Sequence, residues 1–405
     1  MRRSRRHDDG VKRSPAPRIL AIAFALAMSA CTAATRNTVQ APAPAERSTC
    51  VPVGSWVDPT SGQVLTTAAL LPRLADKRVI LLGEVHDSVE HHALQLQTLA
   101  ALAAQRDEVV VGFEMLPRSA QSGLDRWVAG DLDETAFLEA VAWRSNWSLA
   151  PELYLPLFRF ARLNRFPAVA LNVDRSLVTR VGEIGWQALP ADERAGLGDP
   201  AAPSDAYAEW LADVYRDHAD DRSAPIDPTA LQRFIDAQLL WDRAFAEGIA
   251  GALRQHPNAL VAGIIGGGHV QHRWGVPHQL ADLGITDVAV LLPWDRGADC
   301  DKLVPDIADA VFGLEQTGAV AQGPSLGIVI VPDERGVRVA RVSENSIAAA
   351  AGIIDGDVIL EAAGQPIEDV ADMREIVARQ APGTWLPLRI ARDDDEREIV
   401  ARFPR

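Results

Sequence analysis

The sequence predicts an α/β domain with a mostly parallel sheet flanked by helices, followed by a small β-rich α+β domain. Short apolar runs alternate with amphipathic stretches between residues 78 and 291, as buried parallel strands alternate with the helices that join them. A long helical stretch, Ser176 to Leu253, separates two of the runs and is expected to form a helical insertion over the strand ends. From Ser325 the chain changes to short strands, Gly-containing turns and one helix.

Each predicted strand is an apolar run that polar or turn residues bring to an end. The strands are expected at Arg78–Leu82, Glu108–Phe113, Ala168–Asn172, Leu260–Ile265 and Asp287–Leu291. Helices are expected where apolar residues recur at helical spacing. These stretches are Val89–Ala104, Ser119–Ala129, Glu134–Val141, Ser176–Ile184, Asp205–Ala219, Pro228–Leu253 and Val276–Leu283.

The N-terminus has the features of a bacterial lipoprotein signal. A basic segment precedes the apolar run from Ile19 to Met28, which is too short to span a bilayer comfortably. Small residues then lead to Cys31, and this arrangement resembles a lipobox. We expect cleavage before Cys31, its lipidation, and anchoring by several acyl chains on the periplasmic side of the outer membrane, since Thr32 follows. The alternatives are an ordinary secretory signal and an uncleaved anchor.

The predicted boundaries follow from these segments. They are a signal peptide at 1–30, a tether at 31–55, the α/β domain at 56–300, a linker at 301–322 and the small domain at 323–405. Residues 1–30 carry seven Lys or Arg and two Asp or Glu, so their removal lowers the formal net charge from −15 to −20. So acidic a chain is unsuited to bind nucleic acid or anionic lipid head groups.

Two cysteines remain once Cys31 is lipidated, and they flank the predicted α/β domain. In an oxidising periplasm Cys50 and Cys300 are candidates for one disulfide, although the sequence alone leaves this pairing open.

Polar residues follow four of the predicted strands at their carboxyl ends. They stand in Gly83-Glu84-Val85-His86, Phe113-Glu114, Asn172 to Arg175, and Gly266-Gly267-Gly268-His269. Ligands bind at this edge of open parallel sheets, so we expect one shared site. The alternative is a satisfied network of buried hydrogen bonds without a ligand.

The residue types at this edge allow two kinds of chemistry. Glu84, His86, Glu114 and His269 are ligands of the kind that hold Zn or Mn. In a hydrolase Glu84 and Glu114 would instead be the catalytic acid and base. His91 and Gln95 stand i, i+4 on one helix and are expected to face the same site, whereas packing is the expected role of His92 and His278.

The order of these motifs resembles the ChaN family of haem-binding uptake lipoproteins. The resemblance rests on Leu-Leu-Gly-Glu-Val-His-Asp with His91-His92 and Gln95, Gly-Phe-Glu-Met with Gln121, Leu-Asn, Ala237-Gln238 with Trp241-Asp242, Gly-Gly-Gly-His, and Gly275-Val276-Pro277. It covers about residues 50–295. The wider superfamily is similar to Tiki metalloproteases and erythromycin esterases, which share two Gly-x-x-His motifs, here Gly83 to His86 and Gly266 to His269.

The resemblance implies haem bound in a dimer pocket, with a tyrosine oxygen on iron and basic or imidazole groups on the propionates. Tyr154 is our candidate for the axial ligand and Tyr207 its rival, while Arg175 or His272 would take the place of a propionate-binding Lys. The residues expected to contact the cofactor are Glu84, His86, His91, Tyr154, Asn172, Arg175, His269 and His272.

The small domain resembles a bacterial PDZ domain. Leu326-Gly327-Ile328 looks like the loop that binds a peptide carboxylate, and the predicted helix Val370–Ala378 would form the groove wall. A PDZ domain used only for docking or structure is the alternative.

Three functions are thus compatible with the sequence. The first is a haem-binding uptake or trafficking lipoprotein whose PDZ domain binds protein C-termini. The second is a Tiki-type metal-dependent hydrolase, and the third a non-catalytic scaffold. The closer family match favours the first, and whether the chain is an enzyme stays open.

Overall fold

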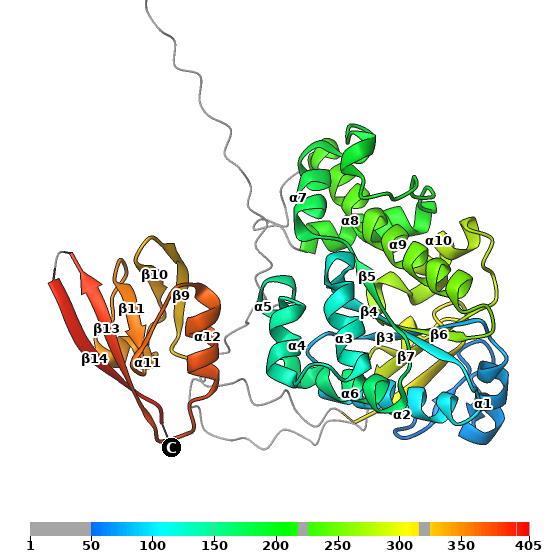
Figure 1. Ribbon diagram of the computed structural model, residues 1–405, viewed down its shortest axis with the longest axis horizontal. Helices are drawn as coiled ribbons and strands as arrows, with labels where there is room; N and C mark the ends of the chain where they lie inside the picture. Colours follow the sequence, from blue (N-terminus) through cyan, green and yellow to red (C-terminus); the bar gives the residue numbers. More distant parts are fainter. Residues whose placement is uncertain (1–49, 148, 218–225, 316–324, 394, 405) are drawn as a thin grey trace, which may run out of the picture. The chain divides into compact units, whose positions relative to one another are not determined.

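The computed structural model describes residues 50–147, 149–217, 226–315, 325–393 and 395–404 (Figure 1). The predicted signal peptide, Cys31 and the tether up to residue 49 lie outside the described residues. No helix in the described ranges is long and apolar enough to span a bilayer.

The α/β domain is built on one eight-stranded sheet in the order β2-β1-β8-β7-β3-β6-β4-β5. All neighbours from β8 to β5 pair in parallel, and β1 and β2 add an antiparallel edge. The strands are β1 Trp56–Val57, β2 Val64–Leu65, β3 Val79–Glu84, β4 Val109–Pro117, β5 Ala168–Asn172, β6 Leu260–Gly266, β7 Val288–Asp295 and β8 Ala310–Leu314. The predicted fold class is therefore confirmed.

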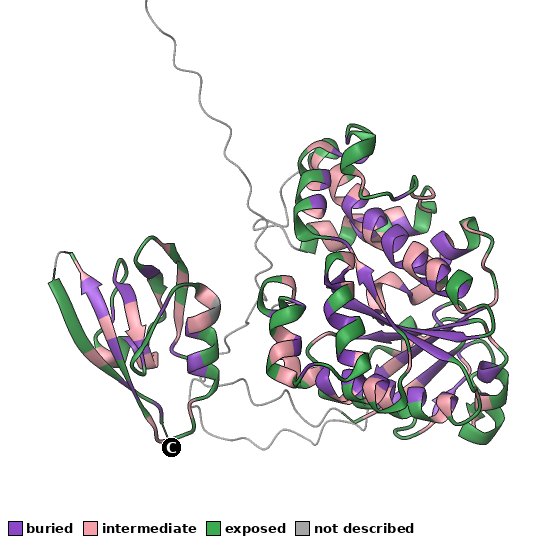
Figure 2. Ribbon diagram, viewed as in Figure 1, coloured by how far each residue is buried: buried purple, intermediate pink, exposed green. Residues whose placement is uncertain are grey.

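Helices cover both faces of this sheet because its central strands are apolar on both sides. In β3, Val79 and Leu81 face a core with α7, α9 and α10, whereas Ile80 and Leu82 face a core with α1 to α6. The strands in the middle of Figure 2 are accordingly buried along their length. The helices are α1 Thr67–Ala75, α2 Val89–Ala103, α3 Gln121–Ala129, α4 Glu134–Ala140, α5 Trp143–Asn146, α6 Leu155–Asn164, α7 Arg175–Ile184, α8 Asp205–Asp217, α9 Pro228–Gln255 and α10 Val276–Asp282.

The predicted helical insertion comprises α7, α8 and α9. The second half of α9 packs on the sheet, with Phe245 and Ile249 in its core. The first half of α9 packs with α8 in a separate small cluster around Tyr207 and Leu211. This part of the insertion carries aromatic side chains toward the site described below.

The prediction of a linker at 301–322 is wrong for its first part. Ala310–Leu314 forms β8, which pairs in parallel with β7 and antiparallel with β1. Ile307 and Val311 are buried in the same core as the central strands. Residues 50–55, predicted as tether, also belong to the domain, since Val51 is buried and Val53 bridges to Gly313. Ala310–Leu314 is an apolar run as long as β5, but no α-helix separates it from β7, so it falls outside the strand–helix alternation by which the other strands were predicted.

The second domain has its own sheet, in the order β14-β13-β11-β10-β9, with β12 paired to β11. Its strands are β9 Ile328–Asp333, β10 Gly336–Val342, β11 Val358–Ala362, β12 Gln365–Pro366, β13 Trp385–Arg392 and β14 Asp395–Arg402. Two helices, α11 Ile347–Ala351 and α12 Val370–Ala378, complete it. Every pairing is antiparallel, and Leu326, Val339 and Met373 share one core.

Candidate functional site

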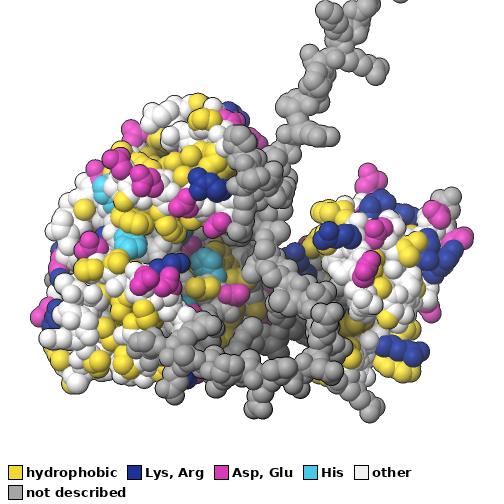
Figure 3. Space-filling model, turned by 180° about the vertical axis from the view of Figure 1, so that it is seen from behind, with side chains coloured by type: hydrophobic (Ala, Val, Ile, Leu, Met, Phe, Trp, Pro, Cys, Tyr) yellow, Lys and Arg dark blue, Asp and Glu magenta, His cyan; other side chains and the backbone are white. Residues whose placement is uncertain are grey.

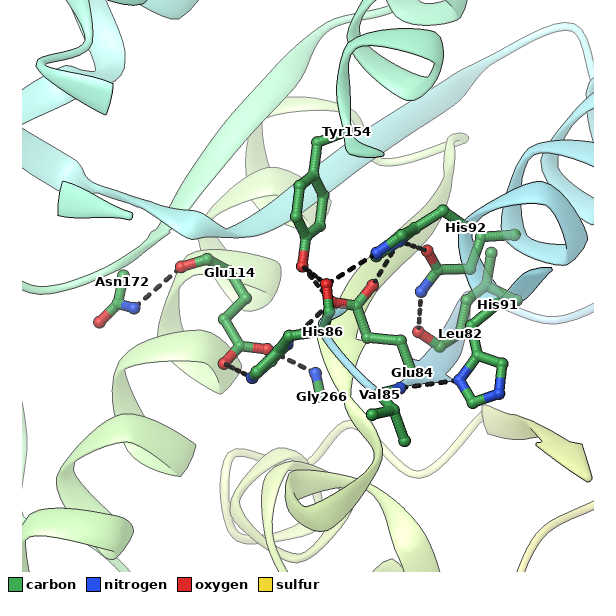
Figure 4. A network of polar contacts seen from close by, with 11 residues as sticks. Leu82, Glu84, Val85, His86, His91, His92, Glu114, Tyr154, Asn172 and Gly266 are labelled. Carbon is green, nitrogen blue, oxygen red and sulfur yellow. Dashed lines mark hydrogen bonds and ion pairs between the residues drawn. The ribbon is translucent and has the colours of Figure 1, made fainter. Parts of the chain in front are cut away.

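The polar residues meet at the carboxyl ends of three neighbouring strands. β6 lies between β3 and β4, and Glu84 at the end of β3 stands in register with Gly266 at the end of β6. Glu114 comes from β4, and its Oε2 accepts a hydrogen bond of 2.5 Å from the Gly266 amide. The parallel topology therefore brings together side chains that are about 180 residues apart in sequence, as Figure 4 shows.

Glu84 is the centre of a buried network. Its side chain is fully buried, and Oε1 accepts hydrogen bonds from the Tyr154 hydroxyl at 2.7 Å and from His86 Nδ1 at 2.9 Å. His92 Nδ1 lies 3.2 Å from the other oxygen, Oε2. Burial alone would raise the pKa of the Glu84 carboxyl, but hydrogen bonds and positive charge from His86 and His92 outweigh it and hold that pKa far below its ordinary value.

His92 is an imidazolium held between acceptors. Its Nε2 lies 3.0 Å from the His86 carbonyl, and its Nδ1 lies 3.1 Å from Gln95 Oε1. Gln95 Nε2 donates to the Leu82 carbonyl, which leaves its oxygen facing the imidazole. Both ring nitrogens must therefore donate. Burial lowers the pKa of His92, but the Glu84 carboxylate and these acceptors raise it above its ordinary value. His92 and Glu84 therefore form a buried ion pair.

His86 lies between two carboxylates. Its Nδ1 donates to Glu84, and its Nε2 is 3.9 Å from Glu114 Oε1. The ring edge contacts Trp147 at a centroid distance of 4.9 Å. Burial lowers the pKa of His86, but the two carboxylates raise it, with a net value of about 9. The His86 side chain is 37% exposed, so a positively charged imidazole lies on the outer side of the network.

A second arrangement of the same kind surrounds His269. Its Nδ1 is 2.7 Å from Oδ1 of Asp242, and the Tyr207 hydroxyl donates to Oδ2 at 2.8 Å. Asp242 and Tyr207 are completely buried. Gly275 has to be glycine here, because a Cβ would lie 2.4 Å from the His269 carbonyl oxygen and 2.7 Å from Asp242 Oδ1.

His86 and His269 face the same space. Each donates through Nδ1 to a buried carboxylate that also accepts from a buried tyrosine, so each points Nε2 away from that carboxylate. Burial lowers the pKa of His269, whereas Asp242 and then Glu114 raise it, and the positive charge on His86 opposes them; the net shift is upward. The position of Gly266, three residues before His269, agrees with this, because a Cβ there would lie 2.8 Å from the His86 ring and 3.4 Å from Glu114 Oε2.

Aromatic side chains of the helical insertion lie beside His269. Trp210 of α8 would touch a Cβ at Gly268 at 3.2 Å, so the glycine before His269 makes room for this indole. Trp210 and Trp274 lie 6.4 Å apart, and the His272 ring stacks on Trp274 at 4.1 Å. All three side chains are half-buried. We call Trp210, His272 and Trp274 the aromatic surface. Figure 3 shows histidines reaching one face of this domain between hydrophobic side chains.

Several predicted site residues have other roles. The two candidate axial ligands, Tyr154 and Tyr207, are both fully buried, and their hydroxyls donate to Glu84 and Asp242. Burial, and then the neighbouring carboxylate, raise the pKa of both phenols far above the ordinary value. For either phenol to bind iron it would have to leave its carboxylate acceptor.

The predicted cofactor contact His91 has partners inside the protein at both ring nitrogens. Its Nδ1 accepts from the Val85 amide at 2.8 Å, and its Nε2 lies 3.1 Å from Asp295, so both nitrogens are used inside the protein. Asn172 donates to the Glu114 carbonyl and joins β5 to the site. Arg175 is exposed at the start of α7, and within the described ranges it forms no ion pair.

The predicted metal set does not form. Among the residues that the structure describes, no three His, Cys, Asp or Glu side chains are arranged to hold a metal ion. The contacts of Glu84 explain this, because its oxygens face Tyr154, His86 and His92. The set Glu84, His86, Glu114 and His269 is therefore a hydrogen-bonded network around two oriented imidazoles.

Sequence reasoning missed the partners of the two histidines. His92 contacts Glu84 directly, although packing was its expected role. Asp242 orients His269, yet the sequence offered it only as part of the motif Ala237-Gln238 with Trp241-Asp242. The signal was present in the spacing Gln238, Trp241, Asp242 on one helix. A carboxylate on an otherwise apolar helix face that packs on a sheet needs a buried partner.

A groove of about 450 Å³ lies at the opposite edge of the sheet. It is lined by residues that include Arg78, Leu253, Arg254, Leu283 and Asp287. Arg78 and Asp287 precede β3 and β7, so the groove lies at the amino ends of the strands and is separate from the polar site.

Comparison with known proteins identifies both domains. Residues 70–280, more than half of the chain, match the family of haem-binding uptake proteins of the Tiki superfamily, ChaN. The chain belongs to the ChaN family. Residues 324–401 match the PDZ domain, as the sequence predicted. No curated protein matches the chain.

Solved structures resemble the two domains separately. A structure of ChaN of Campylobacter jejuni, described as cofacial haem binding, is 20% identical, covers 64% of this chain and 98% of its own, and has a TM-score of 0.50. The serine endoprotease from Yersinia pestis is 30% identical over 20% of this chain and 28% of its own, with a TM-score of 0.18. The HtrA3 PDZ domain with a phage-derived ligand is 24% identical over 19% of this chain and 83% of its own, with a TM-score of 0.18.

The loop before β9 in the PDZ domain has the residues expected of a carboxylate-binding loop. Gly327 has a φ of +74°, and a Cβ there would lie 2.4 Å from Ser346 Cβ. Leu326 is buried and Ile328 is half-buried in the domain core. β9 is an edge strand, so one side of it is open to pairing.

Proposed function

We propose that this ChaN-family protein is a membrane-anchored periplasmic lipoprotein that binds haem for uptake or trafficking, and that its PDZ domain binds protein C-termini. The single observation that carries the haem proposal is the open imidazole of His269 beside the aromatic surface. Anchoring at Cys31 and a periplasm-facing position at the outer membrane are supported by the signal-like N-terminus.

The residues at the site suit haem, whose macrocycle is flat and apolar and whose two propionates are negatively charged. Trp210 and Trp274 offer half-buried aromatic faces on which a macrocycle can stack. His86 carries a positive charge at the edge of the site, which suits a propionate, and Arg175 is exposed at the end of β5 nearby in the fold. Bound haem would supply an iron centre with an open position for a ligand from the protein. We also propose that the loaded protein is a homodimer.

Haem titration of the mature chain with Cys31 replaced tests the proposal. We expect a saturable Soret band at micromolar haem, and weakening of at least about tenfold for Trp210→Ala or Trp274→Ala, because each removes stacking area. The matched control is Trp385→Ala in the PDZ domain, whose indole is 64% exposed and should not affect haem binding. The sedimentation mass of the loaded protein reports the dimer. A folded chain that gives no Soret band at these concentrations would refute haem binding.

The PDZ proposal predicts binding to peptides with a free terminal carboxylate and an apolar last residue. The extended peptide would pair with β9, and loop amides would receive its carboxylate. We expect Gly327→Ala to weaken binding by at least about tenfold, since the new Cβ would collide with Ser346 and displace the loop. Fluorescence polarisation with a labelled peptide measures this.

The control for that substitution is Gly364→Ala. Gly364 has nearly the same φ, +76°, but nothing lies within 4 Å of its Cβ position. It therefore carries the same backbone strain away from the loop. Equal binding of the free-carboxylate peptide and its C-terminal amide would contradict the proposed mode.

A further inference from the structure

The edge strand β9 of the PDZ domain presents two large apolar side chains to solvent. Val329 is 44% exposed and Val331 is 40% exposed, whereas Ile328 and Ile330, which alternate with them, are half-buried against the domain core. Successive side chains of a strand point to opposite faces of its sheet, so the two valines share the outer face. We call them the outer valines. Exposed apolar side chains on an edge strand favour pairing with another chain.

Arginines border the outer valines on the neighbouring strand. Arg341 of β10 stands directly opposite Val329, and Arg338 stands directly opposite Val331. Both arginines are exposed, and Arg338 forms an ion pair with Asp333. An apolar patch with a polar rim is typical of protein interfaces. The outer face of β9 therefore has the composition of a contact surface.

The length of the open edge limits what can pair with it. Pro332 follows Val331 and has no N–H group, and a proline on an edge strand turns its missing donor toward the open side. A partner strand can therefore be bonded only along residues 328–331. So short a segment fits the end of a peptide better than a full strand from a second copy of the chain.

The proposed binding mode determines which peptide side chains meet the outer valines. The loop before β9 receives the carboxylate, so the peptide runs antiparallel to β9 from that end. α12 packs beside β9 (Figure 1), and the apolar last side chain of the peptide points into the groove between them. Because side chains alternate along the added strand, those of the second and fourth residues from the end point to the outer face. Their two-residue spacing matches that of Val329 and Val331.

We propose that the outer valines select protein C-termini that carry apolar side chains at the second and fourth positions from the end. The inference rests on the proposed peptide binding and names the partner by its chemistry, an extended segment that is apolar at its last residue and on its outer face. Apolar pairs across neighbouring strands stabilise a sheet beyond its backbone hydrogen bonds. The outer valines thus add affinity and selectivity that the groove alone does not provide.

Two labelled peptides test the inference by fluorescence polarisation on the mature chain with Cys31 replaced. Both end in valine with a free carboxylate, and they differ only in having leucine or serine at the second and fourth positions from the end. We expect the leucine peptide to bind about fivefold more tightly, the effect of two apolar cross-strand pairs of ordinary strength. In the double variant Val329→Thr with Val331→Thr, this difference should fall below about twofold. Threonine keeps the β-branched shape and the strand propensity, so β9 should stay folded.

The matched control is Val400→Thr. Val400 is 42% exposed on β14, the edge strand on the other side of the same sheet, so it is as exposed as the outer valines but lies away from β9. This variant should keep the full preference for the leucine peptide. Equal affinities of the two peptides for the unsubstituted chain, or a preference lost equally in Val400→Thr, would overturn the inference and leave carboxylate binding in place. If neither peptide binds more tightly than its C-terminal amide, the proposed PDZ function fails, and this inference with it.

Discussion

Glu84→Ala is expected to lower the free energy of unfolding of the α/β domain by about 3–5 kcal/mol, the cost of removing one partner of a buried ion pair. The substitution leaves the His92 imidazolium fully buried without its counter-charge and the Tyr154 hydroxyl without its acceptor. Urea unfolding followed by tryptophan fluorescence measures the change. Nine of the ten tryptophans lie in this domain and only Trp385 in the PDZ domain, so the signal is specific.

Two further variants show whether charge or shape is responsible. Glu84→Gln keeps the side-chain volume and an acceptor for Tyr154, so its loss should be smaller than that of Glu84→Ala. Adding His92→Gln should recover part of this loss, because both charges are then gone. Glu152→Ala is the surface control, since Glu152 is exposed, and it should change stability by less than about 0.5 kcal/mol. A loss at Glu84 no greater than this would contradict the buried ion pair.

The same pair predicts how stability depends on pH. The folded-state pKa of Glu84 is lowered from 4.5, so its contribution is present above that pH and is lost as the pH falls below it. The folded-state pKa of His92 is raised from 6.5, so its contribution is present below that pH and is lost as the pH rises. Stability should therefore be highest between these values, and Glu84→Gln should flatten the decline on the acidic side.

The sequence was most informative where one residue pattern has one structural outcome. The run from Val79 to Leu82 is short, begins with two β-branched residues and is apolar at every position, as expected of a parallel strand buried on both faces. Since parallel strands end at one edge, the position of Glu84, Glu114 and His269 could be inferred without knowing any distance. The contacts agree, with Glu114 bonded to the Gly266 amide and 3.9 Å from His86 Nε2.

The sequence was least informative about what each polar side chain contacts. His91 and His92 are adjacent, yet His91 contacts Val85 and Asp295, whereas His92 pairs with Glu84. Which of the two adjacent histidines faces Glu84 depends on how α2 is rotated about its axis relative to β3. The spacing of apolar residues along a helix does not fix that rotation to within one residue. The partner of Asp242 could not be inferred from the sequence either, because His269 lies 27 residues further along the chain.

Substituting both Cys50 and Cys300 by Ser should lower the free energy of unfolding of the α/β domain by about 3–5 kcal/mol. The disulfide joins residues 250 positions apart, with their Cα atoms 5.7 Å from each other. Closing so long a loop in the unfolded chain removes much of its conformational entropy, so the bond acts mainly on the unfolded state. Urea unfolding, followed as above, measures the loss.

The native fold should survive the substitution. Backbone hydrogen bonds from Gly54 to Gly313 and from Gly313 to Ser55 hold the N-terminal segment against β8 without help from sulfur, and Val51 stays buried. Near-ultraviolet circular dichroism and the haem spectrum should therefore match those of the parent chain. If the spectra of the double variant differed clearly from those of the parent chain, the disulfide would instead be shaping the native site.

The state of these thiols also tests the proposed export. Cysteines are oxidised in a periplasm and stay reduced in a cytosol, so the full chain should yield no free thiol at these positions, while a chain lacking residues 1–30 should yield two. Cys31→Ser in both chains removes the third cysteine from the count. Thiol labelling of whole cells followed by mass spectrometry gives the answer. Reduced Cys50 and Cys300 in the full-length chain would contradict a periplasmic location, while their 5.7 Å separation would still let an added oxidant join them.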